Sequence, residues 1–403
     1  MSSKLKSMWL WVVSLLCVCC LVAMSTNAFA EREEIRIGAH VSMTGMNAMT
    51  GAEQKWSYEQ AVADINAKGG VYVKELDKKL PIKLIFADDK SVADQGAAAM
   101  EKLIKLKKID LALSGNITPI NIAAATVCEK YKVFYSITCS WLDFIEGEKF
   151  KWASDFFTSS SEAARGPFLI WEDLPEDKRP KRPALMMEDN RDGQGFGEGF
   201  RAFAKEYGYK FAVDDPYTPG SKDFSSHILK FKGAKADALI WLGSPTDGIT
   251  LLRQMKEAQV KLPFIIGFKG FWPTEFVQAM GEDANYVVHD GFWSEKNGYP
   301  GSAELGEKFK KAFNRDSVNS GLYYANPQML AMAIEKAGSI DSGKVRDAVF
   351  GGEFKNTVMG DIKFDENGLA LKPLISLQWW NKERMPVYPP NPDVYTFKIA
   401  PTE

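Results

Sequence analysis

The chain has 403 residues, of which 45% are hydrophobic and 25% charged, and its formal net charge is −2 at pH 7. This is an ordinary globular composition, and the length suffices for two or more hydrophobic cores. No basic stripe is present to neutralise phosphates, which argues against nucleic acid as a partner. After the N-terminal segment no apolar run approaches the roughly 18 residues of a membrane span, so we expect a soluble mature protein.

Residues 1–30 are predicted to be a secretory signal peptide. Lys4 and Lys6 precede an apolar run from Met8 to Ala23, and a small-x-small cleavage site ends at Ala30. The alternative, a membrane anchor, is disfavoured because the run is short. The three cysteines of this segment follow bulky residues, which disfavours lipidation. We therefore expect a periplasmic protein.

The stretch from Ile35 to Gly70 predicts a strand, a glycine-rich loop, a long helix and a glycine stop. Further predicted strands are Ile82–Ala87, Ile109–Ser114 and Val133–Ile137, short apolar runs typical of buried parallel strands. Between them lie the predicted helices Gly51–Lys68, Ser91–Lys107 and Pro119–Lys130.

A second series of alternating strands and helices runs from Ala184 to Ile266. The C-terminal third adds further helices and two antiparallel-looking strands, Gly360–Phe364 and Leu374–Trp380. Two such series predict an α/β fold with two lobes. The extended segments Phe150–Ser159 and Val287–Ser294 are the expected connections, about which the lobes would pivot to close on a ligand.

The motifs for catalysis, metals and cofactors are weak. The glycines from Gly193 to Gly199 miss the dinucleotide fingerprint at Glu198, and the three histidines have no metal-ligand spacing. Asp88 and Asp89 could act as general acids, although ion pairs or caps are the commoner role at a strand end. We expect no catalytic residues, no metal and no cofactor.

Cys128 and Cys139 are the two cysteines of the mature chain. A predicted helix and a strand that reverses direction separate them by roughly 13 Å, at 1.5 Å per helical residue. This separation is too large for a disulfide, so we expect free thiols.

Polar and aromatic residues follow several predicted strands, where open α/β sheets bind small molecules. Several hydroxyls and backbone N–H groups at sheet edges suit a carboxylate. The expected ligand-binding residues are Thr50, Asn116, Thr118, Cys139, Ser140, Trp141, Phe196, Ser244, Lys269 and Phe271.

Three blocks of sequence resemble the branched-chain amino acid (Leu/Ile/Val-type) solute-binding proteins of ABC importers. They are S-x-T-G at Ser42–Gly45 with EQAVADINAKGG at Glu59–Gly70, TPGSKDFSSHILKFKGAKADALIWLG at Thr218–Gly243, and AIEKAG with MGDIKFDENG between Ala333 and Gly368. The resemblance spans nearly the whole mature chain. It implies the type I periplasmic-binding fold, with two Rossmann-like lobes, three crossovers and delivery of a ligand to an inner-membrane permease.

By this resemblance lobe 1 comprises residues 31–154 and 293–358, and lobe 2 comprises 155–292 and 359–403. We expect a monomer that is not an enzyme.

The binding positions depart from the family pattern. Pro119 stands where the family has a serine, and Phe196 and Ser244 stand where it has tyrosines. Thr50 replaces a frequent aromatic residue, and Lys269 replaces the acidic residue that pairs with the ligand ammonium group. A cation there would repel an ammonium and attract an anion. The alternative is that Lys269 faces solvent or that the register slips by one.

The preferred hypothesis is therefore a small carboxylate without an α-amino group, with aromatic acids as candidates. The first competing hypothesis is a branched-chain or other amino acid, as in the family. Two more hypotheses are a ligand sensor for a membrane receptor and an exported hydrolase that uses Asp88 or Asp89.

Overall fold

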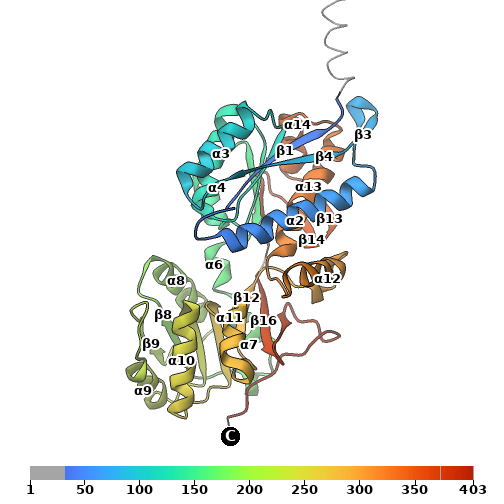
Figure 1. Ribbon diagram of the computed structural model, residues 1–403. Helices are drawn as coiled ribbons and strands as arrows, with labels where there is room; N and C mark the ends of the chain where they lie inside the picture. Colours follow the sequence, from blue (N-terminus) through green and yellow to red (C-terminus); the bar gives the residue numbers. More distant parts are fainter. Residues whose placement is uncertain (1–31, 373, 403) are drawn as a thin grey trace, which may run out of the picture.

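Two α/β lobes, each built on one sheet, make up the protein (Figure 1). The computed structural model describes residues 32–372 and 374–402. The predicted signal peptide lies outside the described residues. Each sheet is buried between helices, as parallel strands require.

The first sheet has six parallel strands in the order β15-β7-β6-β5-β1-β4. The strands are β1 (Ile35–Val41), β4 (Ile82–Asp88), β5 (Leu111–Leu113), β6 (Tyr135–Thr138), β7 (Ala153–Phe157) and β15 (Leu369–Leu371). The helices of this lobe are α2 (Ala48–Ala67), α3 (Ala93–Lys105), α4 (Thr118–Tyr131), α5 (Leu142–Glu148), α12 (Ser302–Phe313), α13 (Ser320–Ala337) and α14 (Ser342–Val349).

The second sheet has seven strands in the order β17-β16-β12-β11-β10-β8-β9. The strands are β8 (Pro183–Met187), β9 (Val213–Asp214), β10 (Ala238–Gly243), β11 (Phe264–Lys269), β12 (Val288–Gly291), β16 (Ile375–Trp380) and β17 (Glu383–Tyr388). β16 pairs in antiparallel fashion with both β12 and β17, and the other neighbouring strands pair in parallel. Around them lie α6 (Ser160–Ala163), α7 (Gly166–Glu172), α8 (Arg191–Glu206), α9 (Ser225–Gly233), α10 (Pro245–Glu257) and α11 (Thr274–Met280).

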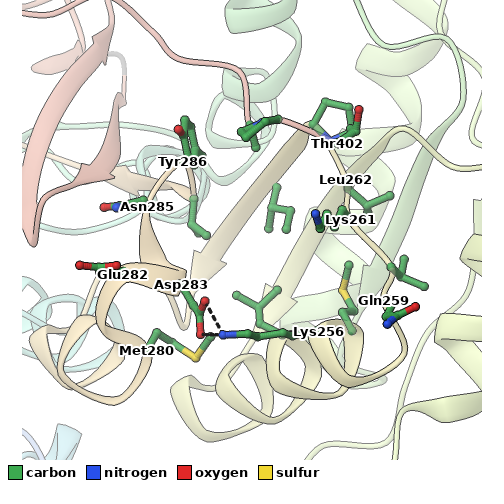
Figure 2. A pocket seen from close by; sticks show the side chains of 18 residues that line it. Lys256, Gln259, Lys261, Leu262, Met280, Glu282, Asp283, Asn285, Tyr286 and Thr402 are labelled. Carbon is green, nitrogen blue, oxygen red and sulfur yellow. Dashed lines mark hydrogen bonds and ion pairs between the residues drawn. The ribbon is translucent and has the colours of Figure 1, made fainter.

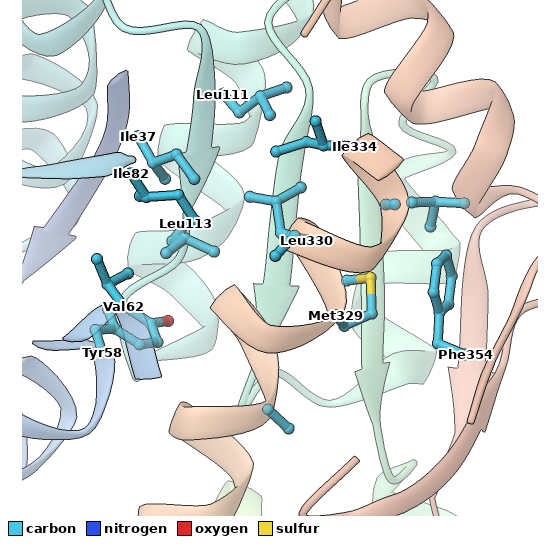
Figure 3. Close-up of a cluster of buried hydrophobic side chains, with 14 of the residues drawn as sticks. Ile37, Tyr58, Val62, Ile82, Leu111, Leu113, Met329, Leu330, Ile334 and Phe354 are labelled. Atoms are coloured by element: carbon cyan, nitrogen blue, oxygen red, sulfur yellow. The ribbon is translucent and has the colours of Figure 1, made fainter. Parts of the chain in front are cut away.

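The core of the first lobe lies between its sheet and α13. Figure 3 shows Leu330 and Ile334 of this helix on the side of Leu111 of the sheet and Met329 on the side of Phe354, and all five are buried. The helix is buried on nearly all sides because its sequence is apolar around the whole circumference. These strands and helices confirm the predicted α/β architecture.

The chain passes from lobe 1 to lobe 2 later than the expected boundary between residues 358 and 359. The hairpin of β13 (Glu353–Thr357) and β14 (Gly360–Lys363) packs on the first core, and β15 pairs with β7. Phe354, Ile362 and Ala370 belong to that core because their apolar side chains are buried there. The chain therefore passes to the second sheet between β15 and β16, later than expected.

Two sheet strands lead directly into the passages between lobes. β7 is followed by α6, which packs against α8 of the second lobe, and β12 is followed by the segment that returns to α12. Cys128 and Cys139 are free thiols in the structure. Burial raises the pKa of Cys139 to about 12, so this thiol is neutral near pH 7.

Candidate functional site

The candidate site lies where the carboxyl ends of the strands of both sheets approach the passages between the lobes. In the first lobe two turns matter, one after β5 and one after β6. In the second lobe the ends of β8, β11 and β12 and the start of α8 contribute. Such edges are the usual binding places of open α/β sheets.

The turn after β5 offers free hydrogen-bonding groups. The backbone N–H groups of Asn116, Ile117 and Thr118 have no acceptor within the described part of the chain. They precede α4, whose N-terminal position Ile117 provides no side-chain cap. The Asn116 Oδ1 atom is buried and also lacks a partner among the described residues. A helix N-terminus with free N–H groups favours an anion.

The turn after β6 is tied to the first turn by two hydrogen bonds. The Trp141 backbone N–H donates to Thr118 Oγ1 at 3.3 Å. The buried Ser140 Oγ accepts a hydrogen bond from Asn121 Nδ2 of α4 at 2.8 Å. Cys139 has a φ of 60°, which turns the chain sharply at the end of β6. The structure therefore brings Asn116, Thr118, Ser140 and Trp141 together, as the sequence predicts.

A buried network of hydrogen bonds holds the start of the turn after β5 in place. His40 Nδ1 lies 2.9 Å from Asp89 Oδ2, and His40 Nε2 lies 2.6 Å from the Tyr135 hydroxyl. The Gly115 N–H donates to His40 Nε2 at 3.1 Å, and the Gly115 carbonyl accepts from Asn121 Nδ2 at 3.2 Å. Both backbone groups of Gly115 are thus fixed at the start of the turn after β5.

The paired carboxylates after β4 are structural in this arrangement. Burial alone would raise the pKa of Asp89, but hydrogen bonds from His40 and Ser42 hold it below the usual range. Asp88 accepts hydrogen bonds from the backbone of Met43 at 3.0 Å and the Thr44 hydroxyl at 2.7 Å. Both carboxylates therefore anchor the glycine-rich loop after β1.

Aromatic rings connect the two lobes beside the turns. The Trp141 ring meets the Phe196 ring of α8 edge-on, with centroids 5.7 Å apart, and Phe196 lies 5.9 Å from Phe268. On the other side Trp141 lies 5.4 Å from Phe157, which contacts Phe292 at 4.8 Å. These five rings form an interlobe aromatic cluster.

Lys269 is not a free cation. Its Nζ atom bonds to Glu188 and lies 2.9 Å from Asp192 Oδ2, so it reaches from β11 across β10 to the end of β8 and the start of α8. Burial alone would lower the pKa of Lys269, but the hydrogen bonds to Glu188 and Asp192 hold it above the usual value. That Lys269 attracts an anion therefore stays a prediction, and the formal charges of the three groups, which sum to −1, argue against it.

Three other predicted residues lie outside the two turns. Ser244 caps α10 by accepting a hydrogen bond from the Asp247 N–H at 3.3 Å. Phe271 is wholly buried and stacks on Trp241 with centroids 4.6 Å apart, which argues against the prediction that it contacts ligand. Thr50 lies in the first turn of α2, where its role stays a prediction.

Sequence reasoning missed Asn121 and Asp290. Asn121 is an ordinary helix residue by its spacing, and only the fold brings it beneath both turns. Asp290 is 9% exposed at the carboxyl end of β12, and its Oδ1 atom is buried with no partner among the described residues. Burial raises the pKa of Asp290 to about 7. The sequence signal that could have identified Asp290 is an acidic residue near the end of a strand.

Three surface cavities are lined by residues other than those of these two turns. One of about 710 Å³ is at the opposite edge of the second sheet, where Lys256 and Asp283 form an ion pair beside Tyr286 (Figure 2). Two others, of about 560 and 580 Å³, lie on the first lobe near α12 and near α5. None of the sequence-predicted site residues lines the first of these three, so volume alone does not identify the site.

Within residues 32–372 and 374–402, no group of three or more His, Cys, Asp or Glu side chains could hold a metal ion. In the same part of the chain no helix combines the length and apolar character that crossing a membrane requires.

Comparisons with known proteins identify a matching family and similar relatives. The periplasmic binding protein family model matches residues 34–383. The Leu/Ile/Val-binding protein homolog 2 of Brucella abortus is 27% identical over 365 residues, covering 90% of this chain and 94% of the relative.

Two solved structures share the fold. The branched-chain amino acid transporter substrate binding protein of Streptococcus pneumoniae, in complex with isoleucine, has a TM-score of 0.69 at 20% identity and covers 87% of this chain and 98% of its own. A solute binding protein of an ABC transporter from Rhodopseudomonas palustris, in complex with 3,4-dihydroxybenzoic acid, has a TM-score of 0.68 at 19% identity, with coverages of 88% and 95%. The chain belongs to the periplasmic binding protein family and is similar to its Leu/Ile/Val-binding members.

Proposed function

We propose that this protein is the periplasmic substrate-binding component of an ABC importer and captures a small carboxylate-bearing solute between its lobes. The observation that carries the proposal is the turn after β5. There the N–H groups of Asn116, Ile117 and Thr118 are free at the N-terminus of α4. Backbone donors fixed at a helix N-terminus bind a carboxylate without a compensating cation.

The interlobe aromatic cluster suggests where the apolar part of the solute lies. The Trp141 and Phe196 rings flank the turns from opposite lobes. Aromatic faces favour a ring or a branched aliphatic chain. The two solved structures with bound isoleucine and 3,4-dihydroxybenzoic acid support both kinds of solute within this fold.

A second candidate is an amino acid. The ion-paired group of Lys269, Glu188 and Asp192 keeps one negative charge in the second lobe. A negative charge there favours a solute with an ammonium group. The Brucella relative, named for leucine, isoleucine and valine, supports this candidate.

Binding proceeds by closure of the lobes. The solute carboxylate docks first on the turns after β5 and β6. The second lobe then brings Phe196 and the end of β12 onto the rest of the solute. Contacts made only in the closed form shift the population toward it, and the closed form delivers the solute to a permease in the inner membrane. The protein acts as a monomer in this scheme.

Mass spectrometry of the solute that copurifies with the protein tests the proposal directly. Calorimetry with leucine, isoleucine, valine and a panel of aromatic and aliphatic acids then ranks the candidates. Tight leucine binding favours the amino-acid candidate, whereas tight binding of an acid without an amino group favours the first. Recovery of a chemically altered solute would instead support an exported hydrolase.

The turn itself is tested by Thr118→Val. This change removes the hydroxyl that accepts from the Trp141 N–H and loosens the connection between the two turns. We expect roughly tenfold weaker solute binding, corresponding to about 1.4 kcal/mol. Thr126→Val is the matched control, because Thr126 is exposed on the same helix and its hydroxyl donates to the Ile122 carbonyl of that helix. Equal affinities of the two variants would contradict the assignment of the turn.

A further inference from the structure

Asp290 carries a buried carboxyl oxygen with no partner in the described chain. The residue lies near the carboxyl end of β12 and is 9% exposed. Its Oδ1 atom is excluded from solvent and accepts no hydrogen bond from the described residues. An unsatisfied buried acceptor destabilises a fold by about 1–3 kcal/mol, so its presence in a folded protein calls for an explanation.

The position of Asp290 connects it with the candidate site. Side chains alternate along a strand, which places Asp290 on the same face of the sheet as Val288. Val288, Phe196 and Phe268 belong to one buried cluster, and the register of Ile266 with Val288 places Phe268 beside Asp290. Phe196 in turn touches Trp141 of the first lobe. The carboxyl group therefore lies next to the interlobe aromatic cluster.

Asp155 shows that burial alone does not carry this argument. Both of its carboxyl oxygens are also buried without a partner in the described chain. However, Asp155 is 0% exposed in the middle of β7, flanked in the sheet by β6 and β15. Asp290 lies near a strand end that meets the passage between lobes, and it retains some exposure.

The first lobe presents a second free acceptor. Asn116 Oδ1 is buried without a partner among the described residues, in the turn that offers N–H groups to the carboxylate. One lobe thus provides donors and an acceptor, and the other provides an acceptor. A solute with a carboxylate alone would satisfy the donors and leave both acceptors unpaired.

We propose that Asp290 accepts a hydrogen bond from the bound solute, which is therefore a carboxylate that also carries a hydroxyl or ammonium donor. This inference rests on the proposed function and narrows its substrate class. A buried site that is built for a donor strongly rejects an analogue without it, because the acceptor is then left unpaired.

The inference has a consequence for pH. Burial raises the pKa of Asp290 to about 7, and its own backbone N–H, the backbone N–H of Lys269 and the charge of Lys269 oppose this rise. The facing residue on β16 is the uncharged Ser376. A donor binds the ionised carboxylate better than the neutral acid. Solute binding therefore releases a proton below pH 7, and affinity rises with pH up to neutrality.

Matched pairs of ligands test the inference. Calorimetry compares leucine with 4-methylpentanoate, and 3,4-dihydroxybenzoate with benzoate, because each pair differs only in its donors. We expect the donor-bearing member of one pair to bind at least tenfold tighter. The pair that shows the preference distinguishes an ammonium from a hydroxyl donor.

Asp290→Ala should abolish this preference and flatten the pH dependence of affinity, while the melting temperature of the solute-free protein stays equal or rises. Asp393→Ala is the matched control, because Asp393 is exposed after β17 and away from the candidate site. If Asp290→Ala does not fold, the pH profile of the wild type and the Asp290→Asn variant provide the test.

Equal binding within both pairs, or a preference that survives in Asp290→Ala, overturns the inference and leaves the proposed function intact. Copurification of an acid without a hydroxyl or ammonium donor would likewise overturn the inference and leave the proposed function intact. Failure of every acid to bind, or a copurified solute without a carboxylate, overturns the proposed function as well.

Discussion

His289 and Asp290 are adjacent on β12, and burial shifts their pKa values in opposite directions. The pKa of His289 falls to about 3 and that of Asp290 rises to about 7. The folded state therefore binds fewer protons at His289 and more at Asp290 than the unfolded chain does. Stability from neutral His289 is lost as pH falls from about 6.5 to 3, whereas stability from protonated Asp290 is lost as pH rises from about 4 to 7.

Between about pH 4 and 6.5 the two contributions oppose each other. In Asp290→Asn the effect of His289 on the free energy of unfolding is no longer opposed by Asp290. The free energy of unfolding should then fall on acidification by up to about 1.4 kcal/mol per pH unit more than in the wild type. His289→Gln should show the reverse slope. Urea denaturation from pH 4.5 to 7.5 measures both, and slopes equal to that of the wild type would refute the assignment.

Lys269 shows what sequence cannot provide at this scale. Its position after a strand is readable, but its partners Glu188 and Asp192 are about eighty residues away in the chain and meet it only across β10. The charge of a binding site is a property of such groups together. The place of Asn116, Thr118, Ser140 and Trp141 in turns after apolar strands was readable from the sequence, whereas their contact with a ligand stays a prediction.

At the level of elements, the turn after β5 depends on a glycine. A Cβ atom on Gly115 would lie 2.6 Å from His40 Cε1 and 2.8 Å from His40 Nδ1. The imidazole is wholly buried and bonded on both nitrogens, so it has no room to move aside.

Gly115→Ala should therefore destabilise the protein by about 1–3 kcal/mol and weaken solute binding, because the turn carries the free N–H groups. Gly147→Ala in α5 is the control, since a Cβ atom there meets nothing within 4 Å. Thermal unfolding and calorimetry on both variants provide the measurement. An unchanged melting temperature in Gly115→Ala would show that the network beneath the turn is dispensable.

Most strands and helices were predictable because their periodicity is strong. The strands near Ile35, Ile82 and Val133 and the helix that ends near Lys68 appear within a few residues of their predicted bounds. The strands β14 and β15 were expected in lobe 2, but they lie with the first lobe. Sequence does not say which sheet or core such a short strand joins, and only the packing of Ile362 and Ala370 decides that.

At the scale of the whole molecule, the proposed function requires the lobes to move about the passages after β7, β12 and β15. The Trp141–Phe196 contact already joins the lobes near these passages. Solute binding should therefore lower the radius of gyration measured by small-angle X-ray scattering while the secondary structure by circular dichroism stays constant. No change in radius with saturating solute would argue against capture by closure. The protein without solute, measured in the same buffer, provides the comparison.

The late position of β15 has a consequence for the order in which the protein is made. The first sheet contains residues from Ile35 to Leu371, and its core needs α13 and Ala370 as well as β1. A chain made from its N-terminus cannot complete this core until nearly all of it has been synthesised. The second sheet needs β16 and β17 in the same way. Neither lobe can complete its sheet early, so the topology itself delays folding of both lobes until most of the chain is available.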